Sequence, residues 1–99
     1  MASDLLLEKC GEVATLIKAL AHPDRLKILC ALSTAEHSVS ELEAGTSLSQ
    51  SGTSQHLKRM KLEGLVTSRR EGTRTLYFIQ DERVLQIISA LSTIFCKTE

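Results

Sequence analysis

The 99-residue chain has few of the residues that interrupt helices, with one proline and five glycines. So few breaking residues leave little material for disordered segments or many turns, and the composition therefore favours helices. A hydrophobic content of 42% with 24% charged residues is ordinary for a globular protein, and 99 residues provide one modest core. We expect a single domain over residues 1–99, with a surface for a partner.

The first residues, Met-Ala-Ser-Asp-Leu-Leu-Leu-Glu, lack the basic segment of a signal peptide and an apolar run that could span a membrane. A cytoplasmic location and no membrane partner are therefore expected. The three cysteines, at positions 10, 30 and 96, are odd in number and include no Cys-x-x-Cys pair. This pattern excludes a secreted disulfide framework and a zinc knuckle, and it predicts free thiols.

Catalytic patterns are also missing. The chain has no nucleophile with an evident base and orienting partner, no glycine-rich phosphate loop and no paired carboxylates at a plausible cleft. We therefore expect neither enzyme activity nor a cofactor. The histidines at 22, 37 and 56 fall at a helix start, in a loop and on a polar helix, where surface or DNA-facing roles account for them.

Residues 38–66 contain the pattern around which the chain is organised: a short helix, a tight turn and a longer polar helix. A capping box begins the first helix, formed either by Ser40 with Glu43 or by Ser38 with Glu41. The second helix is predicted over about 50–63, from a capping serine to Gly64.

The longer helix is predicted to be a DNA-recognition helix, with Leu57 and Met60 facing inward. Its other side chains are of the types that hydrogen-bond base edges and phosphates. The periodicity also allows Thr53 to face inward. The candidate DNA-contacting residues of this helix are Gln50, Ser51, Thr53, Ser54, Gln55, His56, Lys58 and Arg59.

Two short runs at 65–70 and 74–79 predict a β-hairpin around Glu71-Gly72-Thr73. A basic hairpin directly after a recognition helix is typical of a wing, with Leu76 or Tyr77 and Ile79 packed inward. A charged surface hairpin that serves only solubility is the alternative. The candidate contacts to phosphate or the minor groove are Arg69, Arg70, Thr73 and Arg74.

The formal net charge is zero, but the charge is unevenly distributed. Residues 56–74 contain six Lys or Arg and two acidic residues. This window is therefore strongly basic and the remainder acidic. A basic face on a neutral protein is compatible with phosphate binding, whereas basic residues that simply solvate one face are the alternative.

The two terminal helices carry apolar stripes. Ser3 is expected to cap the first helix, which runs to about Leu20, and Asp81 to cap the last. Because the core is small, we predict that these helices meet their copies across a twofold axis; packing of the first helix on its own domain is the alternative. The candidate interface residues are Leu6, Cys10, Val13, Ile17, Leu20, Ile87, Ile88, Leu91, Ile94 and Phe95.

A further helix is predicted from Pro23 to Leu32, with Leu26, Leu29 and Cys30 on its inner face. Cys30 is accordingly expected to be a small buried hydrophobe. Cys96 lies at the edge of the last apolar stripe, where solvent can reach its thiol.

Five segments form one combined pattern: Leu-Ala-His-Pro-Asp-Arg-Leu-Lys-Ile-Leu (20–29), Ser-Val-Ser-Glu-Leu (38–42), Leu-Ser-Gln-Ser-Gly-Thr-Ser-Gln-His-Leu (48–57), Glu-Gly-Leu-Val (63–66) and Arg-Arg-Glu-Gly (69–72). Over nearly the whole chain they resemble the ArsR/SmtB family of winged-helix repressors. The resemblance implies a mainly α fold with a small β-hairpin, a winged helix-turn-helix. It also implies a homodimer through the first and last helices that binds palindromic double-stranded operator DNA until an inducer releases it.

The metal positions of that family are not kept. Its thiolate motif falls at Ser38 and Ser40, and a serine hydroxyl is a poor ligand for soft or borderline metals. Its last-helix motif falls at Asp81, Arg83, Ile94 and Lys97, which leaves one carboxylate and two cations. No metal is therefore expected at these positions. Another departure is Ser47, where family members often carry the glycine that adopts a positive φ more easily.

Cys30 and Cys96 resemble the cysteine pair of the family's redox- and sulfur-responsive branch. That resemblance implies that reactive sulfur or an oxidant links the two thiols by a disulfide or polysulfide and releases the operator. Two unrelated cysteines are the alternative. For Cys10 we favour packing, and a third redox partner or a thiolate site with Cys96 stays open.

Two other functions remain open. One is a metal(loid)-responsive repressor that uses a cysteine with His22 or His37, and the other is a winged-helix protein-interaction module that binds no DNA.

Overall fold

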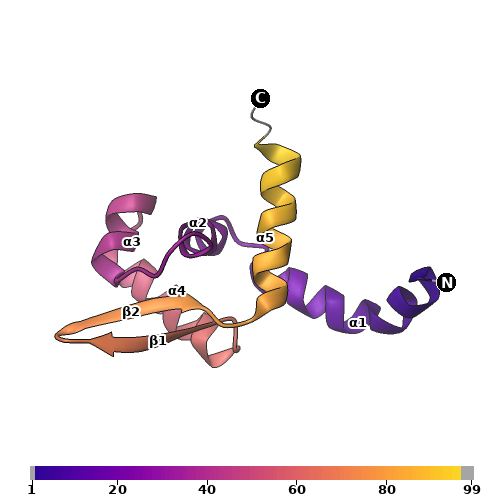
Figure 1. Cartoon of the computed structure of the whole chain (residues 1–99), viewed down its shortest axis with the longest axis horizontal. Coiled ribbons are helices and arrows are strands. Elements are labelled where there is room, and N and C mark those ends of the chain that lie inside the picture. The colour runs from indigo at the N-terminus through magenta and orange to yellow at the C-terminus, as the bar shows by residue number, and fades with distance from the viewer. Residues whose placement is uncertain (1, 97–99) are drawn as a thin grey trace.

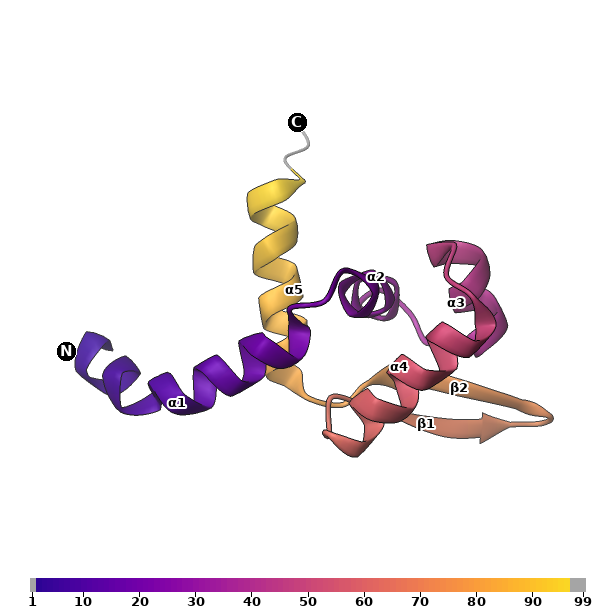
Figure 2. The same cartoon turned by 180° about the vertical axis from the view of Figure 1, so that it is seen from behind.

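The computed structural model describes residues 2–96, with side chains from residue 4 onward. Its elements are α1 (Ala2–Leu20), α2 (Pro23–Leu32), α3 (Val39–Thr46), α4 (Gln50–Leu62), β1 (Val66–Glu71), β2 (Arg74–Ile79) and α5 (Glu82–Phe95). In both views, α2, α3, α4 and the hairpin form one body, while α1 extends away from it and α5 projects in another direction (Figures 1 and 2). The expected helical fold with one β-hairpin is confirmed.

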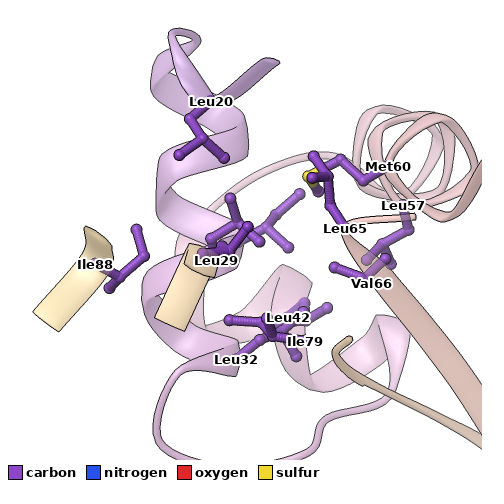
Figure 3. Close-up of a cluster of buried hydrophobic side chains, with 12 residues drawn as sticks. Leu20, Leu29, Leu32, Leu42, Leu57, Met60, Leu65, Val66, Ile79 and Ile88 are labelled. Carbon is purple, nitrogen blue, oxygen red and sulfur yellow. The ribbon is translucent and has the colours of Figure 1, made fainter. Parts of the chain in front are cut away.

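The hydrophobic core lies among α2, α3, α4 and the hairpin. Leu29, Leu42 and Leu57 are fully buried there and point toward one another (Figure 3). Leu20, at the end of α1, and Ile88, on α5, belong to the same cluster and are 4% exposed. The prediction that these two residues face a partner is therefore wrong, because the chain's own core covers them.

Local capping explains where most helices begin. Ser38 accepts a hydrogen bond from the Glu41 N–H at 3.2 Å, and the Glu41 carboxylate accepts one from the Ser38 N–H at 3.0 Å. This capping box decides between the two predicted starts of α3 in favour of Ser38. Asp81 caps α5 as expected, whereas α1 begins at Ala2, so the prediction that Ser3 caps it is wrong.

The turn between α3 and α4 depends on a serine in an unusual conformation. Ser47 has a φ of 63°, in the left-handed region that glycine adopts without the clash of a Cβ atom. Its N–H donates to the Glu43 carbonyl at 2.9 Å and ends α3. The chain therefore makes the tight turn with serine where glycine is common in the family it resembles.

The hairpin pairs Val66 with Ile79 at its base and Glu71 with Arg74 at its tip. Leu76 and Ile79 are buried, as predicted, while Tyr77 is half-buried. An isolated bridge between His37 and Tyr77, with N–H···O distances of 3.1 and 2.8 Å, attaches β2 to the link before α3. The wing is thereby held against the helix-turn-helix. None of the helices within residues 2–96 is long and apolar enough to cross a membrane.

Candidate nucleic-acid interface and thiol sites

The helix α4 presents a polar face to solvent. Leu57 and Met60 are fully buried on its inner side, and Ser49 caps its start by accepting a hydrogen bond from the Gly52 N–H at 3.0 Å. A Cβ atom at Gly52 would lie 2.9 Å from the Ser49 hydroxyl, so glycine leaves room for the cap. The predicted DNA contacts that are exposed on this helix are Gln50, Ser51, Ser54, Gln55, Lys58 and Arg59, and Lys61 and Leu62 are exposed at its end.

Two predicted DNA contacts on α4 face elsewhere. Thr53 is 0% exposed, because it lies one helical turn before Leu57 on the inner face, and its hydroxyl has no hydrogen-bond partner within the described residues. His56 is half-buried and faces the start of α2, with its Nε2 atom 3.8 Å from Asp24 Oδ2. Burial, followed by electrostatic interactions with His22 and Arg25, lowers the pKa of His56, while Asp24 acts in the opposite direction.

Two arginines of the wing form ion pairs with carboxylates of the same chain. The Arg69 guanidinium lies 2.7 Å from Glu36, and that of Arg74 lies 2.8 Å from Glu41. A hydrogen bond from the Ser38 backbone N–H lowers the pKa of Glu41. Burial acts in the opposite direction, and the charge of Arg74 lowers this pKa further. Hydrogen bonding and charge from Glu36 raise the pKa of Arg69. Because such exposed ion pairs contribute little net free energy, phosphate can replace the carboxylates.

Other cations near this face differ in how they are paired. Arg59 lies 3.2 Å from Glu63, and Lys61 donates to the Ser68 hydroxyl at 2.7 Å. Among residues 2–96, Lys58 has no acidic partner, and the Arg70 guanidinium donates to the Thr75 hydroxyl and the Gly72 carbonyl without forming an ion pair. Among these cations, Lys58, Lys61 and Arg70 therefore have no compensating carboxylate within residues 2–96. Thr73 is exposed at the hairpin tip.

The three thiols are exposed and unbonded to one another. The prediction that Cys30 is buried is wrong: Ile28, Leu29 and Leu32 form the inner face of α2, and Cys30 follows Leu29 by about 100° of rotation. Cys96 ends α5, where its N–H donates to the Ser92 carbonyl at 2.8 Å. Solvent can therefore reach all three sulfur atoms in this single chain.

The positions of the two family metal motifs have other roles. Ser38 caps α3, and Asp81 is paired with Arg83 at 2.7 Å, an interaction that lowers the pKa of Asp81 through its hydrogen bond from Arg83. Arg83 also lies 2.7 Å from Glu12 of α1. Lys97 lies outside the described residues. Within residues 2–96, no cysteine belongs to a group of three potential metal ligands.

The terminal helices expose large apolar side chains. Ile17 on α1 is 53% exposed, and Phe95 on α5 is 78% exposed. Leu6 and Ile94 are also exposed, as is Cys10, whereas Val13, Ile87 and Leu91 are half-buried. Part of the predicted interface is therefore exposed to solvent, whereas Leu20 and Ile88 belong to the core.

Comparison with known proteins gives consistent matches. Residues 22–68 match the family described as bacterial regulatory protein, arsR family. The HTH-type transcriptional regulator YgaV of Escherichia coli is 49% identical over 86 residues, which cover 86% of this chain and 87% of that protein.

Two solved structures extend the likeness to the fold. The transcriptional repressor BigR from Xylella fastidiosa has a TM-score of 0.90 and 36% identity, covering 99% of this chain and 100% of that one. A homodimeric winged helix-turn-helix DNA-binding domain from Mycobacterium bovis, described as a possible ArsR-family regulator, has a TM-score of 0.72 and 35% identity, covering 93% of this chain and 82% of that one. The resemblance predicted from the sequence and the winged helix-turn-helix fold are confirmed.

Proposed function

The chain belongs to the ArsR family, whose members regulate transcription by binding DNA and are not enzymes, and from that premise we propose that it is a homodimeric repressor of palindromic operator DNA. Its inducer is a reactive sulfur species or an oxidant that links Cys30 to Cys96. Since bacterial DNA lies in the cytoplasm, the protein acts there.

The exposed polar face of α4 is the observation that carries DNA binding. Gln50, Ser51, Ser54 and Gln55 stand at its amino-terminal end, the part of a recognition helix that contacts base edges. Lys58 and the wing supply charges for phosphate. The buried Thr53 and the inward-facing His56 act instead by holding α4 in position.

A second copy is the occupant that best suits the exposed apolar side chains of α1 and α5. Ile17, Ile94 and Phe95 are large and open in the single chain, and α1 extends away from the rest of the fold (Figure 2). Large exposed apolar patches mark interaction surfaces. The related Mycobacterium bovis domain is described as homodimeric. A twofold dimer would present two α4 helices to half-sites roughly 34 Å apart.

The thiol step is ordinary exchange chemistry. With peroxide, one thiolate displaces a hydroxide to form a sulfenic acid, and the second thiol displaces water from that sulfur to form a disulfide. With glutathione persulfide, one thiol takes the outer sulfur and releases glutathione; the second thiol then attacks the inner sulfur and releases hydrogen sulfide. If both thiols first take up a sulfur atom, the same loss of hydrogen sulfide leaves a trisulfide.

A link between α2 and α5 would act on operator spacing. The buried residues Ile28 and Leu29 of α2 pack in the core with Leu42 of α3 and Leu57 of α4. Displacing α2 therefore moves the helix-turn-helix relative to α5 and the dimer axis. Small changes in the separation of two recognition helices are sufficient to lose a paired half-site.

The test measures binding to a palindromic duplex selected in vitro with reduced protein. Peroxide or glutathione persulfide should weaken binding by the parent, while Cys30→Ser and Cys96→Ser should stay bound. Cys10→Ser is the matched control and should respond like the parent. Intact mass distinguishes the products, since a disulfide removes two hydrogens and a trisulfide also adds a sulfur atom. Release of either Cys30→Ser or Cys96→Ser from the duplex would exclude the dithiol switch.

A further inference from the structure

Three potential metal ligands meet where the start of α2 faces α4. His22 and Asp24 flank Pro23, and His56 reaches them from the recognition helix, so that one ligand atom from each residue lies within 4.8 Å of the others. We propose that His22, Asp24 and His56 form a binding site for a divalent cation of the zinc class. The site contains no cysteine and is separate from the proposed thiol switch.

The distances are close to those of a coordination shell. Ligands about 2.0–2.1 Å from a tetrahedral zinc ion lie about 3.4 Å from one another. His56 Nε2 and Asp24 Oδ2 are already 3.8 Å apart, and the rings of His22 and His56 are 4.7 Å apart between centroids. Small side-chain rotations, about 1 Å at the ligand atoms, would therefore complete the set.

The chemistry of the donors fits a borderline metal. Two imidazoles and one carboxylate suit zinc, and three protein ligands leave a coordination position open. His22 and His56 line a groove of about 770 Å³, which provides space for a water molecule there.

Nearby charges do not prevent cation binding. Arg25 lies near the site, but its guanidinium is paired with Glu63 at 3.1 Å and donates to the Ala19 carbonyl at 2.8 Å. Asp24 supplies a negative charge directly at the site. Two neutral imidazoles and this carboxylate carry −1 together, so a bound divalent cation gives the site a net charge of +1.

Binding has a local cost at the start of α2. His22 Nδ1 accepts a hydrogen bond from the Asp24 N–H at 3.1 Å, which places the proton of the neutral ring on Nε2. Coordination through Nε2 moves that proton to Nδ1, and coordination through Nδ1 occupies its lone pair. Either arrangement removes the helix cap that His22 supplies. Metal binding thus replaces a cap within α2 by a link from α2 to α4.

The experiment titrates untagged, reduced protein with Zn²⁺ by calorimetry and with Co²⁺ by absorption spectroscopy, without DNA. We expect one ion per chain and Co²⁺ bands without thiolate charge transfer. His22→Asn removes the ligand but keeps a good helix cap, and His56→Gln removes the second imidazole. Each should raise the Kd for Zn²⁺ at least about tenfold, since loss of even an outer partner costs that much.

His37→Gln is the matched control, because His37 lies outside the cluster beside Glu41. It should bind Zn²⁺ like the parent. Unchanged binding by His22→Asn, a thiolate band in the Co²⁺ complex, or no binding by the parent would each overturn the proposal. His22→Asn keeps the test valid if His56→Gln does not fold. Because DNA is absent, the result is independent of the thiol switch.

Discussion

The two halves of this protein, the segment from α2 to β2 and the terminal helices α1 and α5, place their large apolar side chains differently. From α2 to β2, the large apolar side chains point inward, apart from Leu62, and ion pairs such as Arg74–Glu41 connect segments distant in sequence. In α1 and α5, large apolar side chains point outward, with Phe95 78% exposed. The first half buries its apolar surface within one chain, whereas the second leaves apolar surface exposed to water. In the proposed function, DNA reading and assembly are therefore built on separate surfaces that share one core.

The halves are nevertheless connected. Leu20 and Ile88 lie in the common core, and Arg83 links α5 to Glu12 of α1 at 2.7 Å. A change in how α1 and α5 contact a partner can therefore alter the position of the helix-turn-helix through these packed side chains. Substitutions in one half or the other can separate the two roles.

The largest effect is expected inside the helix-turn-helix. Leu57→Ala should lower the free energy of unfolding by about 2–5 kcal/mol, because it opens a cavity at a fully buried position. Urea unfolding at fixed protein concentration measures this loss. Leu62→Ala, on the same helix but 79% exposed, is the control and should change stability by no more than about 0.5 kcal/mol. Equal losses would show that α4 packs differently.

The next effect is expected on assembly. Ile17→Glu places a carboxylate on the exposed apolar face of α1 and should weaken dimerisation by about 2 kcal/mol, roughly 30-fold in Kd. Sedimentation equilibrium measures the change. Leu62→Glu introduces the same charge at an exposed leucine of α4, outside the proposed interface, so it should leave the dimer intact. Dissociation by Leu62→Glu and not by Ile17→Glu would reassign the interface to α4.

The smallest effect is expected on the acid stability of the first half, the segment from α2 to β2. The folded pKa of Glu41 lies below its ordinary value of 4.5, so its stabilising contribution is complete above pH 4.5 and is lost as pH falls through the lower folded pKa. Glu41→Gln should flatten this part of the profile, measured as urea midpoints at decreasing pH. Glu43→Gln is the control on α3, since the Glu43 carboxylate has no ion pair within residues 2–96. Parallel profiles for Glu41→Gln and the parent would contradict this role.

Local signals predicted most of the fold. Asp81 and Ser49 cap helices, and Gly64, at a φ of 80°, follows α4, because such signals act within a few residues. The choice between Ser38 and Ser40 required the structure, since both are followed three residues later by glutamate. The family pattern was also readable, because its motifs lie in continuous segments.

The candidate site was less predictable, since small rotations decide exposure. Cys30 was expected to be buried beside Leu29, yet one residue of helix turns it to solvent. Thr53 was named as a candidate DNA contact although the periodicity also allowed it to face inward, and it is buried. The pairing of Arg69 with Glu36 joins residues 33 positions apart, which no local pattern reveals. The contact of His56 with His22 likewise joins residues far apart in the sequence, so no local pattern predicts their cluster with Asp24.

The ion pairs of the wing affect the ion exchange that accompanies operator binding. An arginine that moves from Glu36 or Glu41 to a phosphate displaces a cation from the DNA, but it leaves a carboxylate that takes one up. Such a contact contributes less than the usual slope of about 0.9 per neutralised phosphate to the dependence of log affinity on log salt. Lys58, Lys61 and Arg70, which have no such carboxylates within residues 2–96, would then account for most of the salt sensitivity. Part of the wing's affinity for DNA would therefore persist as ionic strength rises.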